Sequence, residues 1–203
     1  MASNQFFEKE GPFPLSEIIE KINCSVNVQN FNDFKINNVA SLVLAKSNDL
    51  TFLNSVKYKD ISLKTKAFAC ITSSNLSKYL PNNCIKLNVK NVLLAVTQVS
   101  KMFYPKSDLD YPDLNLLNSS EIKSKYPDVN FGQNVLIGKN VEIGKNSQIG
   151  SNTIIESNVK IGNNCILGSF VNIKNSIIGN FVNIKDGSKI GVKGFGFIPN
   201  NEK

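Results

Sequence analysis

The chain has 203 residues, of which 41% are hydrophobic, so it is long enough for one large or two small domains with buried cores. Its formal net charge is +7. All 23 basic residues are lysines, spread along the chain without interleaved aromatic clusters, which favours a solvated surface over a nucleic-acid-binding patch. The chain has no histidine and no Cys-x-x-Cys pair, so we expect no metal site.

The four cysteines, Cys24, Cys70, Cys84 and Cys165, stand among apolar neighbours, as in "AFACIT". This setting predicts reduced, buried thiols in a cytoplasmic protein. The opening sequence "MASNQFFEKEGPFPLSEIIE" is too polar for a signal peptide. No apolar run reaches the roughly 18 residues that a membrane span needs, so we expect no integral membrane span.

Residues 1–104 have the pattern of a small α/β domain. In "PLSEIIEKI", Leu15, Ile18, Ile19 and Ile22 follow helical spacing, although Ser16 could instead cap a shorter helix. The continuous apolar run 67–73 predicts a buried strand. The other expected elements are strands in 34–42, 50–54 and 84–89 and a helix over 91–104. Residues 105–128 contain three prolines and many polar residues, and this composition predicts a linker.

From residue 129 onward a six-residue unit repeats. Its first position is always apolar: Phe131, Ile137, Ile143, Ile149, Ile155, Ile161, Leu167, Ile173, Ile178, Ile184 and Ile190. The second position is mostly glycine, with Glu156 and Lys174 among the exceptions, and the fifth is small or β-branched. Asparagine recurs in the fourth position, and the spacing slips by one residue after Ile173.

A six-residue period fits neither a helix nor an ordinary strand, but it fits a solenoid of short strands and turns. Three units close one triangular coil, so 18 residues advance the axis by one strand spacing of about 4.8 Å. The first residue then points inward, and the fourth occupies a corner where asparagine tolerates the left-handed backbone conformation. No coil is stable alone, because each one hydrogen-bonds to its neighbours. The rival structure, a series of β-hairpins, would show longer and less regular spacing.

The pattern Ile/Leu/Val-Gly-x-x-small-x resembles the hexapeptide-repeat acyltransferases, whose prism is a left-handed parallel β-helix and usually trimeric. The handedness comes only from this resemblance, because crossover rules would favour a right-handed coil. The implied fold is an α+β N-terminal domain followed by a left-handed parallel β-helix over 129–203, which we expect to be truncated. An open last coil would expose unpaired backbone groups, so we expect poor solubility or oligomerisation.

Three further stretches narrow the family. The segment "INNVASLVLAKSNDLTFLNSVKYKD" (36–60) is similar to the N-terminal domain of the UDP-3-O-(3-hydroxyacyl)glucosamine N-acyltransferases, which perform the third step of lipid A biosynthesis in Gram-negative bacteria. The run "AFACIT" follows where the family has it, and "IGVKGFGF" (190–197) looks like its Gly-Phe-Gly-Phe segment. The order of domain, linker, prism and Gly-Phe-Gly-Phe matches over nearly the whole chain.

The resemblance implies a uridine site. By position Phe52 and Tyr58 would flank the uracil ring, as the family's aromatic pair does. Phe52 could instead be an ordinary core residue of its strand. The family's Asn-Pro falls on Ser55 and Val56, so Ser55 would have to hydrogen-bond the pyrimidine edge, while Asn54 lies one place early.

The implied reaction joins a 3-hydroxyacyl group, carried on acyl carrier protein, to the 2-amino group of UDP-3-O-acylglucosamine. In the family a histidine acts as general base; none occurs here, so we expect it beyond Lys203, and the 203-residue chain alone to be inactive. Glu156, Asp186 and Lys189 are candidate substitutes in the prism, but charged corner residues are usually solvated.

The resemblance implies a homotrimer in the cytoplasm without a cofactor, with the nucleotide sugar and the acyl carrier protein as partners. Two alternatives stay open: a non-catalytic module that binds a nucleotide sugar and trimerises, and another hexapeptide-repeat enzyme, such as a sugar or serine acetyltransferase that uses acetyl-CoA. Those enzymes generally lack the domain with Phe52 and Tyr58. A γ-type carbonic anhydrase is excluded, because histidines hold its zinc.

Overall fold

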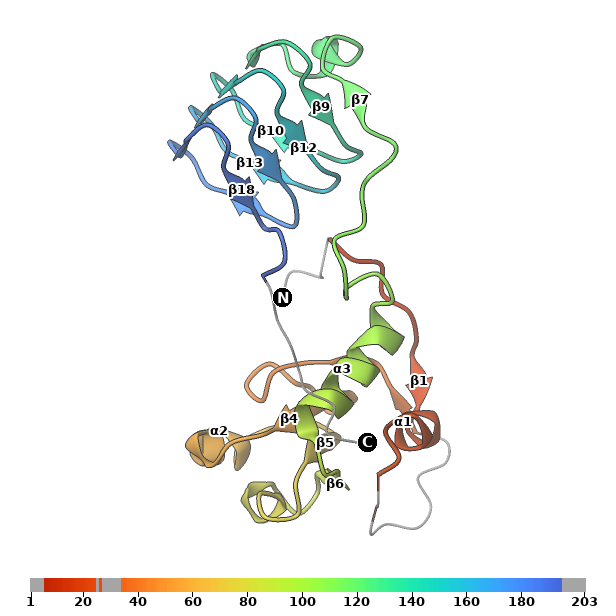
Figure 1. Cartoon of the computed structure of the whole chain (residues 1–203). Helices are drawn as coiled ribbons and strands as arrows, with labels where there is room; N and C mark the ends of the chain where they lie inside the picture. The colour runs from red at the N-terminus through yellow and green to blue at the C-terminus, as the bar shows by residue number, and fades with distance from the viewer. Residues whose placement is uncertain (1–5, 25, 27–33, 195–203) are drawn as a thin grey trace. The chain divides into compact units, whose positions relative to one another are not determined.

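The computed structural model describes residues 6–24, 26 and 34–194. Within these residues the chain forms two compact units, one over residues 7–108 and one from residue 109 onward (Figure 1). Each unit has its own hydrophobic core. None of the helices in the described part of the chain has the length and apolar composition needed to cross a membrane.

The N-terminal unit is built on a parallel four-stranded sheet with the order β3-β4-β5-β6. The sheet strands are β3 (Asn38–Val39), β4 (Asp49–Leu53), β5 (Ala69–Thr72) and β6 (Ile85–Asn88). The helices are α1 (Leu15–Ile22), α2 (Lys59–Ser62) and α3 (Val92–Phe103), with short 3-10 turns η1 (Val56–Tyr58) and η2 (Ser77–Tyr79). Strands β4 and β5 lie in the middle of the sheet, which explains why nearly all their residues are buried, including Thr51 and Thr72.

Helices α1 and α3 bury the main core against the sheet. In α1, Leu15 and Ile18 have no exposed surface, and the helix ends at Asn23 in the left-handed conformation. The helix begins directly after Pro14, so Ser16 is not its cap. In α3, the Asn91 side chain caps the first turn by accepting a hydrogen bond from the Leu94 amide at 3.1 Å.

The predicted strand over residues 34–42 was wrong in one respect, because it is two strands with different partners. Its first part, β2 (Lys35–Ile36), pairs antiparallel with β1 (Phe13–Pro14). Its second part, β3, pairs parallel with β4. Both parts are only two residues long, so period-two alternation could not separate them.

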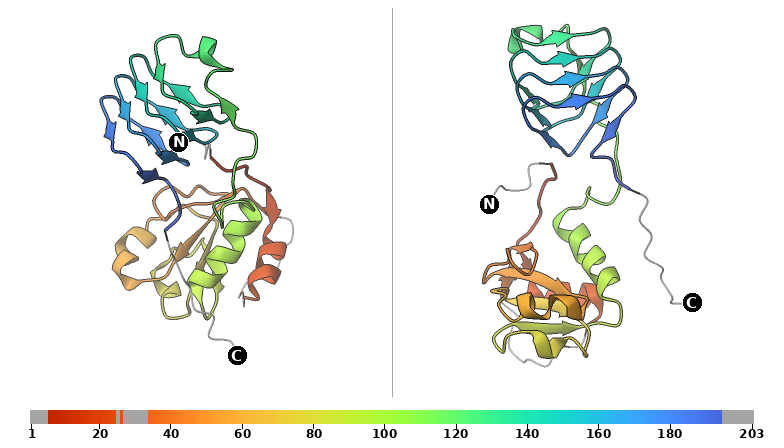
Figure 2. Two further views of the ribbon diagram at one scale, coloured as in Figure 1. Left: turned by 45° about the horizontal axis from the view of Figure 1, so that its top comes forward. Right: turned by 90° about the vertical axis from the view of Figure 1, so that its left-hand side faces the viewer.

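The second unit is the parallel β-helix that the six-residue period predicts. Its two-residue strands form three sheets, in the orders β10-β13-β16, β17-β14-β11-β8 and β18-β15-β12-β9-β7, with β7 (Leu117–Asn118) at the edge of the third. They are β8 (Asn130–Phe131), β9 (Leu136–Ile137), β10 (Glu142–Ile143), β11 (Gln148–Ile149), β12 (Ile154–Ile155), β13 (Lys160–Ile161), β14 (Ile166–Leu167), β15 (Asn172–Ile173), β16 (Ile177–Ile178), β17 (Asn183–Ile184) and β18 (Lys189–Ile190). Figure 2 shows the coils stacked one on the next. The handedness of the coil stays a prediction from the resemblance.

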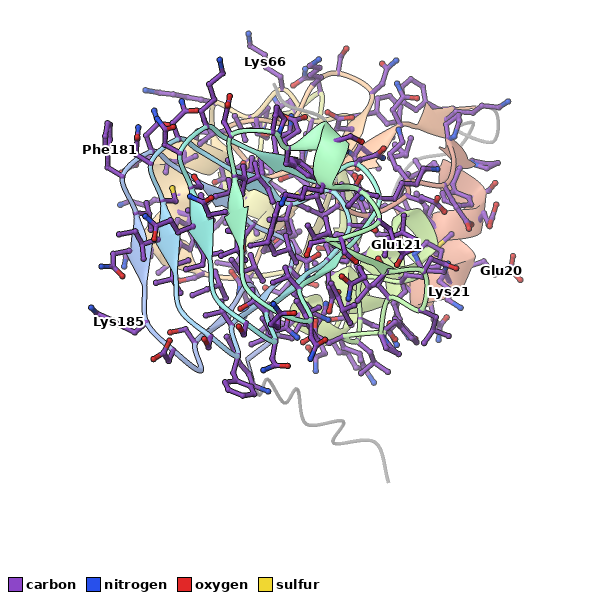
Figure 3. The ribbon with its side chains drawn as sticks, turned by 90° about the horizontal axis from the view of Figure 1, so that it is seen from above. Glu20, Lys21, Lys66, Glu121, Phe181 and Lys185 are labelled. Carbon is purple, nitrogen blue, oxygen red and sulfur yellow. The ribbon has the colours of Figure 1, made fainter. Side chains whose placement is uncertain are left out.

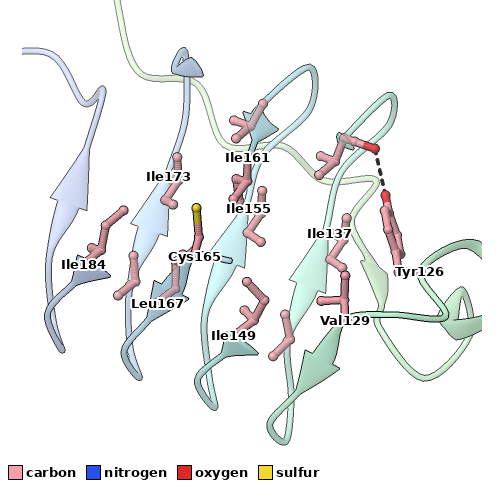
Figure 4. Packing of buried hydrophobic residues seen from close by; sticks show 14 residues of the cluster. Tyr126, Val129, Ile137, Ile149, Ile155, Ile161, Cys165, Leu167, Ile173 and Ile184 are labelled. Carbon is pink, nitrogen blue, oxygen red and sulfur yellow. Dashed lines mark hydrogen bonds between the residues drawn. The ribbon is translucent and has the colours of Figure 1, made fainter. Parts of the chain in front are cut away.

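Register and burial both follow the repeat. Gln148 pairs with Ile166, eighteen residues on, whereas Lys160 pairs with Ile177, so the one-residue slip shortens one coil. The first residues of the units stack in the interior (Figure 4), and fifth residues such as Val135 and Val141 are fully buried. Six asparagines in the fourth position have positive φ between 55° and 65°: Asn134, Asn140, Asn146, Asn152, Asn158 and Asn164.

Most of the predicted linker, residues 105–128, belongs to the prism unit, which starts at Leu109. Strand β7 (Leu117–Asn118) pairs antiparallel with β9, and a 3-10 turn η3 (Lys123–Lys125) follows. Tyr126 is buried under the first coil, and its hydroxyl donates a hydrogen bond to the Val141 carbonyl at 2.8 Å (Figure 4). This segment therefore covers one end of the solenoid, as terminal caps do in repeat proteins. The other end reaches the Gly-Phe-Gly-Phe segment, whose residues 195–197 lie outside the described part.

Candidate functional site

The three residues predicted to bind uridine lie at the carboxyl end of β4 and in the turn that follows it. Ser55 continues the extended backbone of the strand, with φ −150° and ψ 140°. Its hydroxyl accepts a hydrogen bond from the Lys57 amide at 3.3 Å, and its carbonyl accepts one from the Tyr58 amide at 3.2 Å. These two bonds form the 3-10 turn η1 and place Ser55 and Tyr58 side by side.

Tyr58 and Phe52 differ in their surroundings. The Tyr58 side chain is 43% exposed, so part of its ring is accessible to a ligand. Phe52 is partly buried and packs against the core that α1 and α3 cover. In the described residues, no ring contact joins Phe52 and Tyr58. The structure thus brings Ser55 and Tyr58 together on one turn and leaves Phe52 partly in the core.

A cavity of about 490 Å³ lies elsewhere in the same unit. It opens between the end of α1, the end of β6 and the start of α3, and its lining includes Lys21, Asn88 and Asn91. None of the three predicted uridine residues lines it. Tyr58 lies on the exposed turn η1, apart from the lining of this cavity.

In the prism, two of the three departures from glycine in the second position, Glu156 and Lys174, form a pair with each other. Glu156 and Lys174 occupy the same corner of adjacent coils, and their side chains form an ion pair at 2.9 Å. Both are largely buried, with 15% and 8% of their side chains exposed. Asp110, from the segment before β7, lies 3.9 Å from the Lys174 amine and accepts a hydrogen bond from the Lys193 amide.

Asp113 also attaches the segment before β7 to the prism, through Ser157, the residue that follows Glu156. Its carboxylate accepts a hydrogen bond from the Ser157 hydroxyl at 2.5 Å. This bond is the main cause that lowers the pKa of Asp113 below its ordinary value; the backbone amide of Asn115 and the charge of Lys174 act in the same direction. Residues 110–113 are therefore fastened to the prism by charged and polar contacts.

These contacts bear on the residues considered as substitutes for the missing base. Glu156 is occupied by Lys174, and the Asp186 carboxylate accepts a hydrogen bond from the Ser169 amide at 2.6 Å. Both carboxylates are part of the corner structure. Lys189 is exposed on β18. In the described part of the chain, no group of three or more His, Cys, Asp or Glu side chains is placed to hold a metal ion.

The cysteines are all free, and Cys70, Cys84 and Cys165 are buried, as the sequence predicts. Cys24 is half-buried. Burial raises the pKa of Cys24 and of Cys84 to about 11. These two thiols are therefore protonated at neutral pH and poorly suited to nucleophilic chemistry.

Comparison with known proteins identifies both parts of the chain. Residues 33–102 match the family model of UDP-3-O-(3-hydroxymyristoyl) glucosamine N-acyltransferase, LpxD. Residues 128–160 and 140–175 match the bacterial transferase hexapeptide model of six repeats. The first match contains Phe52, Ser55 and Tyr58, and the second contains the prism corner of Glu156 and Lys174.

Curated relatives named UDP-3-O-acylglucosamine N-acyltransferase support the first match. The protein of Rickettsia rickettsii (strain Sheila Smith) is 32% identical over 104 residues, which cover 51% of this chain and 30% of the relative. Those of Rickettsia prowazekii and Parvibaculum lavamentivorans are each 31% identical over 105 residues, again 30% of the relative. The aligned region thus spans about a third of each relative's length. Residues 33–102 are thus similar to the UDP-3-O-acylglucosamine N-acyltransferases, and residues 128–175 carry bacterial transferase hexapeptide repeats.

Proposed function

We propose that this chain is the nucleotide-sugar-binding and prism-forming part of an N-acyltransferase. The reaction transfers a 3-hydroxyacyl group from acyl carrier protein to the 2-amino group of UDP-3-O-acylglucosamine, in lipid A biosynthesis in the cytoplasm. The observation that carries the proposal is the turn after β4, which presents Ser55 and an exposed Tyr58 together inside the family domain.

In the proposed site the uracil ring stacks on Tyr58. Stacking of a base on an aromatic ring contributes about 1–3 kcal/mol, and an exposed ring on a short turn loses little entropy when a base covers it. The Ser55 hydroxyl uses one acceptor position within its turn, so its O–H remains to donate to a carbonyl oxygen of the pyrimidine. Phe52 would stack on the other face of the uracil ring, after its side chain rotates away from the main core.

The chemistry needs a general base, because the attacking amine must lose a proton as it adds to the thioester. Residues 1–203 contain no histidine, and Glu156 and Asp186 hold the corners together. We therefore assign binding, and not proton transfer, to these residues, and place the catalytic histidine outside them. The purified 203-residue chain should then show no N-acyltransferase turnover.

The absence of histidine also favours one alternative, a non-catalytic module that binds a nucleotide sugar and trimerises. Both functions need the uridine site, and turnover separates them. If the chain is expressed together with any continuing sequence that carries a histidine, N-acylation of UDP-3-O-acylglucosamine supports the enzyme. Uridine binding with no turnover in the complete native protein supports the module.

We propose a homotrimer as the working assembly, and two phenylalanines of the prism support it. Phe170 and Phe181 stand in the fourth position, where asparagine recurs, with φ of 58° and 60°. Their side chains are 67% and 78% exposed, and Phe181 points away from the ribbon in Figure 3. A left-handed conformation costs a residue with a Cβ roughly 1–2 kcal/mol, so an exposed aromatic ring there needs a compensating contact, which a neighbouring subunit would provide.

The test of the binding site is calorimetric titration of the chain with uridine and with UDP. Tyr58→Ala should weaken uridine binding about fivefold or more, since a stacking contact of about 1–3 kcal/mol is lost. Ser55→Ala should weaken it less, by the worth of one hydrogen bond. Tyr111→Ala, which removes a tyrosine that is 50% exposed in the other unit, is the matched control and should leave binding unchanged. Equal affinity of Tyr58→Ala and the unmodified chain would refute the site.

A further inference from the structure

Residues 55–67 combine exposed aliphatic side chains with uncompensated positive charge. Val56, Ile61 and Leu63 are 53%, 42% and 54% exposed. The same segment carries four exposed lysines, which are Lys57, Lys59, Lys64 and Lys66. Because its only acid is Asp60, the segment has a net charge of +3. We call residues 55–67 the lysine-aliphatic turn.

The four lysines form no ion pair in the part of the chain that the structure describes. Elsewhere in the described part of the chain, Lys101, Lys145, Lys160 and Lys174 each have a carboxylate partner. Although lysines are spread evenly along the sequence, this turn carries a local excess of positive charge. Such an excess attracts an anionic partner.

The turn also projects from the unit. Figure 1 places α2 at the end of the N-terminal unit opposite α1, and both views of the sheet in Figures 1 and 2 agree on this. The turn is fastened at its base, because the buried Ser62 hydroxyl donates to the Lys59 and Tyr79 carbonyls at 2.8 and 2.9 Å. Its aliphatic side chains are thus held outward on a protruding and anchored element.

A second exposed loop, which follows Leu42, lies beside the small core cluster of Leu53, Cys70, Leu80 and Cys84. Leu42 packs against the cluster that contains Leu53, and Tyr79 belongs to the same cluster. The following residues, Val43 and Leu44, are 71% and 50% exposed. The loop that follows Leu42 is therefore also apolar and exposed, and it carries the exposed Lys46.

We propose that the lysine-aliphatic turn docks the protein on an anionic lipid bilayer surface. Protruding aliphatic side chains enter the headgroup region, and lysines beside them pair with acidic headgroups while their stems stay along the interface. An acidic protein would satisfy the lysines but would need a hollow for the three aliphatic side chains. The bilayer satisfies both features, and this inference does not depend on the uridine site, so Tyr58 is left unchanged in its test.

The experiment is co-sedimentation of the full chain with vesicles, at low and at physiological salt. One set is pure phosphatidylcholine, and the other contains 30% phosphatidylglycerol. We expect binding to the acidic vesicles that falls with salt, and little binding to the neutral ones. Each lysine near an acidic surface contributes about a fivefold factor, so Lys64→Gln with Lys66→Gln should lower the partition coefficient roughly 25-fold. Leu63→Ser should lower it several-fold without changing the salt dependence.

Matched controls remove the same groups elsewhere. Lys139→Gln with Lys185→Gln changes the net charge equally in the prism, where both lysines are exposed, and should lower binding far less. Leu93→Ser removes a leucine that is 44% exposed on α3 and should have no effect. Equal loss in the control and test variants would overturn the proposal. Binding to polyglutamate with no binding to acidic vesicles would assign the turn to an acidic protein and overturn it as well.

Discussion

Removing Lys174 should destabilise the prism far more than removing a lysine from an exposed pair of the same geometry. The ion pair of Glu156 and Lys174 is short, at 2.9 Å, and only 15% and 8% of the two side chains are exposed. Lys174→Met leaves the Glu156 carboxylate without its partner in a largely buried site, and uncompensated buried charges cost about 3–5 kcal/mol. We expect a loss near 3 kcal/mol, at the lower end of this range, because 15% of the Glu156 side chain remains exposed to water.

The prism contains its own control. Glu142 and Lys160 are also eighteen residues apart and also 2.9 Å from each other, but their side chains are 65% and 41% exposed. Exposed pairs contribute about 0–1 kcal/mol, so Lys160→Met should destabilise the prism by less than 1 kcal/mol. The two variants differ in burial and share the same chemistry and stacking geometry.

A double-mutant cycle completes the test. Glu156→Gln with Lys174→Met removes both charges, and such replacements of a buried pair are often nearly neutral. The double variant should therefore be more stable than Lys174→Met alone, with a coupling energy of about 2 kcal/mol. Hydrogen exchange of the β12 and β15 amides, measured by mass spectrometry, reports the local free energy of opening. Additive losses, or equal losses at Lys174 and Lys160, would refute the reasoning.

Three further changes test other parts of the prism. Ser157→Ala should raise the pKa of Asp113 toward its ordinary value, and NMR titration of the carboxyl carbon can follow this change. Because the pKa of Asp113 is lowered in the folded state, its hydrogen bond with Ser157 stabilises the prism above about pH 4. This stabilisation is lost on further acidification. Phe181→Asn should weaken self-association in analytical ultracentrifugation while stabilising the monomer by about 1 kcal/mol, because asparagine tolerates φ of 60°; a parallel loss of both would contradict a role in assembly. Gly150→Ala should lower the melting temperature by several degrees, because its Cβ would overlap the backbone of the next coil, whereas Gly179→Ala meets nothing within 4 Å and should be neutral.

The prism could be predicted from the sequence because several positions of the six-residue unit repeat with the same period. The inward isoleucines, the corner asparagines and the small fifth residues each repeat independently, and only a three-sided coil satisfies all of them. The fifth position even tolerates polar residues for a reason visible in the structure. The hydroxyls of Ser147 and Thr153 donate to the Gly162 and Gly168 carbonyls at 3.0 Å, so they are buried without being unsatisfied.

The segment before the prism could not be predicted because its contacts are not periodic. Residues 109–128 are rich in proline and polar side chains, which is also the composition of a linker. Their role depends on single contacts, such as that of Asp113 with Ser157, forty-four residues away in the sequence. A short strand such as β7 gains its stability from its partner β9, so the strand propensity of its own residues does not predict it.

The departures from the repeat were the most informative signals, and their meaning needed the structure. Glu156 and Lys174 break the glycine pattern eighteen residues apart, which is one coil, so the period itself could have paired them. Phe170 and Phe181 break the asparagine pattern eleven residues apart and lie at two different corners, so they do not pair with each other in the same way. The charged residues Glu156 and Lys174 pair between adjacent coils and so stabilise the prism. The aromatic side chains of Phe170 and Phe181 are instead exposed at the surface. The same distinction separates Phe52, which the core partly accounts for, from Tyr58, which it does not. Of the aromatic pair, Tyr58 is therefore the more exposed residue, and its role in binding uridine stays a prediction.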